Sequence, residues 1–97
     1  MYAIIRHYQV PASQQEEVVR RVDESWLEEV RKMKDFQSYY VMRGGPNELM
    51  SVTMFLTKEA SNASALANRR WQEERLLDQE VTLLNSWNGD VLVHGAR

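Results

Sequence analysis

The chain has 97 residues, which is enough for one domain, and we therefore treat residues 1–97 as a single domain. Twelve Lys and Arg against fourteen Asp and Glu give a net charge of -2, which argues against a nucleic-acid-binding module with its usual basic excess. The absence of cysteine excludes disulfides and thiol chemistry, and two histidines are too few for a three-histidine metal site. The longest apolar run, Met1–Ile5, is too short for a membrane span or a signal-peptide core, so we expect a cytoplasmic protein that binds no membrane.

The first predicted element is a β-strand over residues 2–10, which is rich in β-branched and aromatic residues and stops at Pro11. Neither face of this strand is plainly polar, so we expect both faces to be covered. A long helix is predicted next. Ser13 and Glu16 fit a capping box, and apolar residues then recur at helical spacing as far as about Lys34.

Two further strands are predicted over residues 36–43 and 49–56, joined into a hairpin by the turn residues 44–47. The third strand has one wholly apolar face and one mixed face. The apolar face consists of Met50, Val52, Met54 and Leu56.

The last part of the chain is predicted to hold a second helix over residues 61–84 and a short strand over residues 91–94, separated by a break at residues 88–90. The resulting order β-α-β-β-α-β, in fewer than 100 residues, predicts an α+β fold of the ferredoxin-like type. Right-handed crossovers place both helices on one face of the sheet. The other face would expose apolar side chains, so we expect two chains to pack their sheets together as a homodimer.

Five stretches of the sequence carry a resemblance to a known family: Met1–Tyr8, Asp35–Tyr40, Ser51–Phe55, Ala67–Trp71 and Gly89–His94. In these stretches the chain resembles the dimeric α/β-barrel proteins of the antibiotic-biosynthesis-monooxygenase-like group. The resemblance covers nearly the whole chain and implies a ferredoxin-like domain that forms a dimeric α/β barrel. The group contains cofactor-free oxygenases, haem-degrading enzymes and members without known activity, so the resemblance is more specific for fold than for function.

The haem-degrading members of the group share an Asn on the first strand, a Trp early in the second helix and a haem-ligating His about ten residues later. This chain carries Arg6 and His7 on the first strand, and its predicted second helix has neither the early Trp nor any His. We therefore expect no haem and no other cofactor.

Arg6 and His7 interrupt an otherwise apolar strand and, as neighbours on a strand, point to opposite faces. One should face the helices, where the group keeps its pocket, and the other the dimer interface. Arg6 is a candidate for binding an anionic substrate, and His7 is a candidate general base. His94, on a strand expected beside the first, is a second candidate base. The alternative interpretation is that Arg6 and His7 are hydrogen-bonded interface residues. His7 and His94 without a carboxylate would make a poor metal site, so we expect no metal.

Four aromatic residues are candidates for contacts with a flat aromatic substrate. Trp26 and Trp71 lie on the apolar stripes of the two helices and could wall a pocket, although such residues more often belong to the core. Tyr39 and Tyr40 point to opposite faces of their strand, so one of them should face the helices and could bind a phenolic ligand.

The sequence therefore predicts a homodimeric small-molecule-binding protein. The resemblance implies cofactor-independent monooxygenation of an aromatic or quinol-like compound as its activity. The alternative is a non-enzymatic dimerisation or assembly module without a ligand pocket, in which the core fills the space between helices and sheet.

Overall fold

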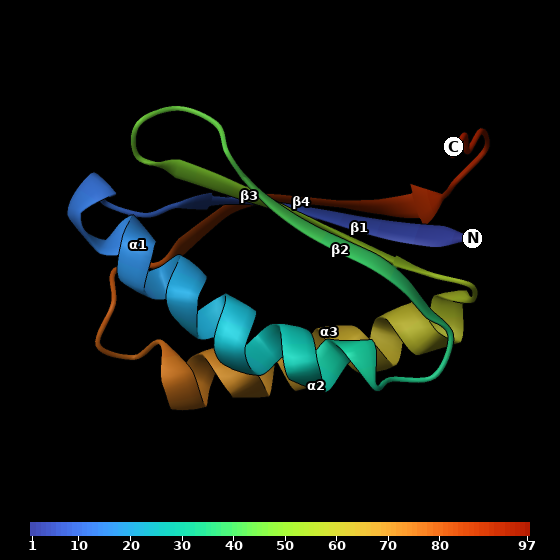
Figure 1. Cartoon of the computed structure of the whole chain (residues 1–97), viewed down its shortest axis with the longest axis horizontal. Helices are drawn as coiled ribbons and strands as arrows, with labels where there is room; N and C mark the ends of the chain where they lie inside the picture. Colours follow the sequence, from blue (N-terminus) through green and yellow to red (C-terminus); the bar gives the residue numbers. More distant parts are fainter.

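A computed structural model describes residues 1–97 as one four-stranded sheet with helices on one side (Figure 1). All neighbouring strands are antiparallel, in the order β2-β3-β1-β4. This is the predicted α+β ferredoxin-like fold. In chain order the elements are β1 (Tyr2–Gln9), α1 (Ala12–Arg21), the π-helical segment η1 (Val22–Trp26), α2 (Leu27–Arg31), β2 (Phe36–Arg43), β3 (Glu48–Phe55), α3 (Lys58–Arg75) and β4 (Thr82–Asp90).

The first helix runs without a break from α1 through η1 to α2, as the apolar periodicity predicted. Its start differs from the prediction, because the capping box at Ser13 and Glu16 is not used. The helix begins at Ala12 with Pro11 at the N-cap, where the proline ring already fixes a φ of -52°. The backbone N–H of Ala12 donates instead to Asn47 Oδ1 at 3.1 Å, which ties the helix start to the β2-β3 loop.

The predictions for the last third of the chain were wrong in their boundaries. α3 begins earlier than predicted, with the Thr57 hydroxyl accepting from Ala60 N–H at 3.2 Å, and it ends at Arg75. Residues 82–90 form β4 beside β1, whereas the sequence predicts a helix as far as residue 84 and a break at residues 88–90. The segment 91–97, which includes the predicted strand 91–94, lies outside the sheet.

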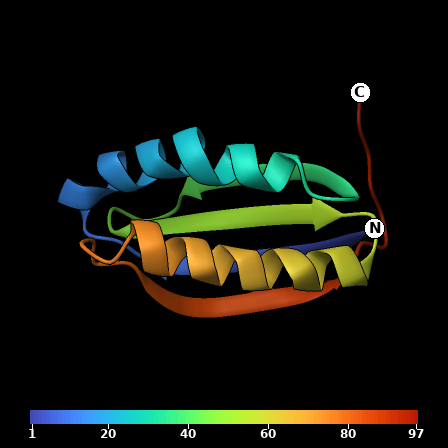
Figure 2. The ribbon, with the colours of Figure 1, turned by 90° about the horizontal axis from the view of Figure 1, so that it is seen from below.

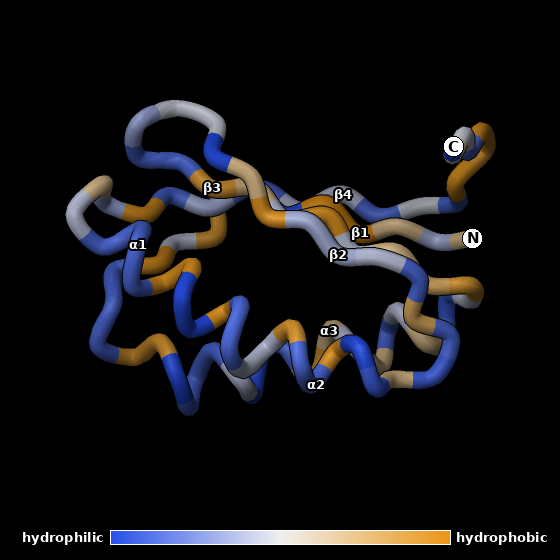
Figure 3. The backbone as a smooth tube through the Cα atoms, in the orientation of Figure 1, coloured by the Kyte–Doolittle hydropathy of each residue, from blue (hydrophilic) through white to orange (hydrophobic).

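The helices cover one face of the sheet and leave the other bare (Figures 1 and 2). Along β3, the mixed face is the buried one, while the wholly apolar face points away from the helices. The open face is the side of the sheet without helices. The register of the strands places on it Ile5, His7, Tyr40, Met42, Met50, Val52, Met54 and Trp87, together with Ala3, Ser38, Asn85 and Gly89. The hydropathy trace shows apolar parts on β1, β2 and β3, whereas most of β4 is hydrophilic (Figure 3). The expected bare apolar face is thus present.

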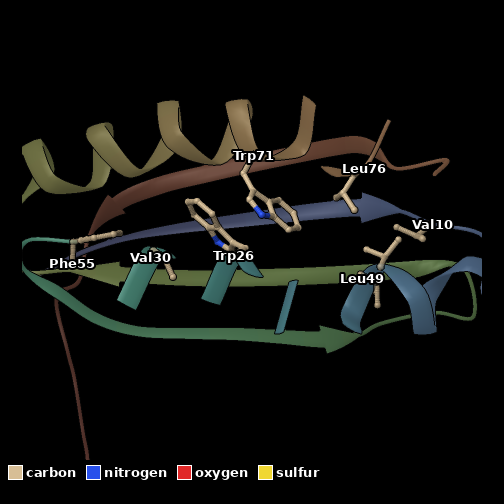
Figure 4. Close-up of a cluster of buried hydrophobic side chains, with 8 residues drawn as sticks. Val10, Trp26, Val30, Leu49, Phe55, Trp71 and Leu76 are labelled. Carbon is tan, nitrogen blue, oxygen red and sulfur yellow. The ribbon is translucent and has the colours of Figure 1, made fainter. Parts of the chain in front are cut away.

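The core between helices and sheet is centred on two tryptophans (Figure 4). Trp26 and Trp71 are 2% and 4% exposed, and their ring centroids lie 6.1 Å apart with the planes tilted by 47°. Trp71 Nε1–H donates to Ser25 Oγ at 2.8 Å, so its polar atom is satisfied within the core. Ser25 and Trp26 both belong to η1, whose wider turn presents them toward α3. No helix of the structure is both long enough and apolar enough to cross a membrane.

An ion-pair cluster links the end of α3 to α1 and makes stability depend on pH. Hydrogen bonds from Arg20 and Arg21 lower the pKa of Glu17 to about 2, and hydrogen bonds from Arg21 lower the pKa of Asp78 well below its ordinary value. Both carboxylates have depressed folded-state pKa values, so their stabilisation is complete above about pH 4.5 and is lost as the pH falls toward 2.

We expect the urea midpoint of the protein to be lower at about pH 3 than at about pH 6. The decrease should be smaller in Arg21→Gln, which removes the contacts of Arg21 with Glu17 and Asp78. Chemical denaturation at the two pH values measures the difference. An equal fall in both proteins would show that other carboxylates dominate acid destabilisation.

Candidate binding groove

A half-open groove of about 380 Å³ lies between α3 and the strands β1 and β4. The even-numbered residues of β1 form its floor, because they point toward the helices. Five of the thirteen lining residues are hydrophobic, namely Tyr2, Ile4, Tyr8, Ala65 and Leu83. Most of the lining is polar and comes from all three elements: Arg6, Asn62, Asn68, Arg69, Gln72, Glu73, Ser86 and Asn88. A groove of this kind suits a ligand that is itself rich in hydrogen-bonding atoms.

Arg6 is the charged residue on the floor of the groove. Its strand neighbours in register are Ser51 and Ser86, whose small side chains leave room for the guanidinium. Arg6 is half-buried, and it forms no ion pair and no side-chain hydrogen bond in the structure. Because a partly buried cation is stabilised by an anionic partner, this residue can anchor a negatively charged ligand group. The structure thus places Arg6 on the helix side and His7 on the other side.

Beside Arg6, a hydrogen-bonded chain crosses the groove. Gln72 Nε2 donates to the Tyr8 hydroxyl oxygen at 3.1 Å and to Asn68 Oδ1 at 2.7 Å. Burial raises the pKa of the Tyr8 hydroxyl above its usual value, although Arg6 and Gln72 act in the opposite direction, so the hydroxyl keeps its proton at neutral pH. The Tyr8 O–H and the Asn68 Nδ2–H groups donate to no protein atom and remain available to a ligand.

Behind this chain lies a second, much smaller cavity of about 40 Å³, lined mainly by apolar side chains. Tyr8, Asn68 and Gln72 line both spaces and therefore form the wall between them. Tyr39 lines the inner cavity, and burial raises the pKa of its hydroxyl well above its usual value. Tyr39 is consequently the tyrosine that faces the helices, as one of the two was predicted to do, but it is separated from the groove.

The other predicted site residues do not line the groove. His7 lies on the open face, where its Nε2 is 3.0 Å from Glu48 Oε1, and Tyr40 is exposed on that face. His94 is exposed in the segment that follows β4, so the prediction that it lies on a strand beside the first was wrong. Trp26 and Trp71 pack against each other in the core, and Trp71 lines the inner cavity but not the groove.

Sequence reasoning missed most of the polar lining. Ser86 and Asn88 were overlooked because their segment was not recognised as a strand beside β1. Asn68 and Gln72 are one helical turn apart, so they share the face of α3 toward the sheet, but polar residues in a helix more often form a solvated surface. The signal that could have found them is the polar pair on the otherwise small and apolar stripe of the helix.

No family model matches the sequence, and no curated protein matches it. Solved structures do match. A mutant of MhuD with two manganese protoporphyrin IX molecules bound per active site superposes with a TM-score of 0.80 at 20% identity over 100% of both chains. A dimeric ferredoxin-like protein from an uncultured marine organism gives 0.80 at 11% identity, covering 99% of this chain and 98% of that one. A mutant of SnoaB, a cofactor-independent oxygenase from Streptomyces nogalater, gives 0.71 at 10% identity, covering 96% and 94%.

The chain has the antibiotic-biosynthesis-monooxygenase-like fold. This fold assignment agrees with the resemblance read from the sequence, and identities of 8–20% among the matching structures carry the fold alone. What this groove binds must therefore be argued from its own residues.

Haem does not fit the residues of this groove. The lining contains no histidine, because one of the two lies on the open face and the other follows β4. No group of three His, Cys, Asp or Glu side chains that could hold a metal ion is present either.

We expect a hemin titration to give no saturable Soret shift at one equivalent per chain. A stoichiometric shift that is lost in His7→Ala or His94→Ala would contradict this expectation.

Proposed function

We propose that this chain binds a small organic anion in the groove between α3 and the sheet, with Arg6 as the anchor. The observation that carries the proposal is the half-buried guanidinium of Arg6, which lines the groove without an acidic partner. The groove's single carboxylate, Glu73, is exposed on α3 and forms no ion pair with it. The polar groove supports this function over the alternative of a module without a ligand pocket.

The remaining donors near Arg6 indicate an oxygen-rich ligand. The Tyr8 O–H and the Asn68 Nδ2–H groups have no acceptor in the protein and lie at the wall of the groove, where a ligand can accept from them. A ligand that carries a second oxygen next to its anionic oxygen would satisfy them together with Arg6. Gln72 supports this arrangement as a positioning residue, since its amide occupies a Tyr8 lone pair and leaves the hydroxyl hydrogen free to turn toward the ligand.

Cofactor-independent oxidation is a second candidate function. Arg6 and the protonated Tyr8 could stabilise the oxyanion of a quinol-like substrate, whose own electrons would reduce O₂. In such a reaction an activated CH₂ becomes C=O with one oxygen atom of O₂, and the other leaves as water. A likeness to SnoaB, described as a cofactor-independent oxygenase, also favours this candidate. The groove lacks a histidine base, so the substrate would have to reach it already acidic or ionised.

The location of binding can be tested by NMR. The probe is 2-hydroxy-1,4-naphthoquinone, a planar anion with neighbouring oxygen atoms, titrated into ¹⁵N-labelled protein. We expect the largest amide shifts in β1, β4 and the face of α3 that carries Asn68 and Gln72. Shifts confined to the open face, or no saturable shift at millimolar probe, would contradict the proposed groove.

We also propose that the chain forms a homodimer through the open face. The sheet buries its mixed face under the helices and leaves its more apolar face uncovered, which is costly for a monomer in water. Tyr40, Met42 and Trp87 are exposed there, around the partly buried Val52. The likeness to a dimeric ferredoxin-like protein supports the same arrangement. Packing two such sheets face to face would bury these side chains and the His7–Glu48 pair.

A further inference from the structure

The chain after β4 is a segment of strand-forming sequence that has no strand to pair with. Residues 91–93 are Val-Leu-Val, and a strand was predicted there for that reason. In the structure only one bond continues the sheet, from Val91 N–H to the carbonyl of Met1 at 2.8 Å. Beyond it, Leu92 and Val93 are 90% and 92% exposed, more than any other large apolar side chain of the protein. We call residues 91–97 the tail.

The tail leaves the sheet toward the open face. In Figure 1 the helices lie below the strands, whereas the end of the chain rises above them. The backbone of the tail therefore rises on the side of the open face, and the exposure of Leu92 and Val93 shows that they do not pack on their own sheet. This is the side on which we placed a second copy of the chain.

We infer that in the homodimer the tail of each subunit packs against the partner subunit, with Leu92 and Val93 covering apolar side chains at the rim of the partner's open face. The inference rests on the proposed homodimer. Face-to-face sheets lie about 10 Å apart, and seven extended residues span about 23 Å, so the tail can cross the gap. Two-fold symmetry makes the contact twice, so four exposed apolar side chains would be buried per dimer.

The dimer dissociation constant tests the inference. Sedimentation equilibrium would compare the native chain with the double variant Leu92→Ser, Val93→Ser and with a matched control, Leu77→Ser. Leu77 is also a highly exposed leucine, at 82%, but it follows α3 on the helix side. We expect the double variant to raise the constant by about 10-fold or more and the control to leave it unchanged.

A second measurement detects the contact without weakening it. The chain has no cysteine, so Val93→Cys takes a nitroxide label at one position. In dimers mixed with ¹⁵N-labelled native chains, broadening of ¹⁵N signals can arise only between subunits, and we expect it for residues of the open face. If the native chain is monomeric, both the proposed homodimer and the proposed tail contact are wrong. A native dimer with an unchanged constant in the double variant and no broadening would overturn the tail contact alone.

Discussion

Replacing Trp71 with alanine is expected to lower the free energy of unfolding by about 3–5 kcal/mol, the largest effect on stability that we predict for one substitution. Trp71 is almost fully buried, and its ring packs against Trp26 at the centre of the core. The variant loses the transfer free energy of the indole and leaves a cavity beside an already present space of about 40 Å³. It also leaves Ser25 Oγ without its indole donor.

Urea denaturation of Trp71→Ala measures this loss, and Leu77→Ala serves as the control. Leu77 is a large apolar residue just beyond the end of the same helix, but its exposure predicts a change within about 0.5 kcal/mol. A loss below about 1 kcal/mol in Trp71→Ala would mean that the tryptophan pair is not packed as described, and that Trp71 is available to wall a ligand site.

The second large effect concerns the homodimer. Val52 lies on β3 between Ile5 and Tyr40 in register, at the middle of the open face. We expect Val52→Lys to convert the dimer to a monomer at micromolar concentration, because two lysines would be buried against each other near the two-fold axis. Light scattering measures the mass of the native and variant proteins.

Ser13→Lys is the control for this experiment, because it adds the same charge at an exposed position of α1. It should leave the mass unchanged. Circular dichroism separates dissociation from unfolding, since a lysine on a solvent-exposed face of the monomer should keep the native spectrum. A dimer that persists in Val52→Lys would place the interface elsewhere on the molecule.

The fold was predictable because its main signals are local. The apolar spacing of the first helix, the turn at residues 44–47 and the β-branched first strand each depend on residues close in sequence. The order of these elements then limits the topology to the ferredoxin-like arrangement. The prediction failed for residues 76–84, where Leu77, Val81 and Leu84 continue a helical spacing. Their segment nevertheless contributes to β4, because pairing with β1 outweighs the local pattern.

The candidate groove was less predictable because it depends on which face of each strand meets the helices. Arg6 and His7 were recognised as opposite-facing, but their sequence cannot say which one faces inward. In the structure the less apolar face of β3 is the buried one, contrary to the usual rule for a monomer. The rule fails here because the apolar face is free to meet a second chain. Consequently His7 is not part of the candidate site, whereas Asn68 and Gln72, which were not predicted, line it.

The most direct test of the central claim is isothermal titration of 2-hydroxy-1,4-naphthoquinone into the native chain, Arg6→Ala and Arg70→Ala. Arg70 is an exposed arginine of α3 that does not line the groove, so its removal changes the net charge equally. If Arg6 anchors the anion, Arg6→Ala weakens binding by about 1.5–3 kcal/mol, the value of a hydrogen bond to a charged group, and Arg70→Ala leaves it unchanged. Equal affinities in all three proteins, or no binding by the native chain, would contradict the account.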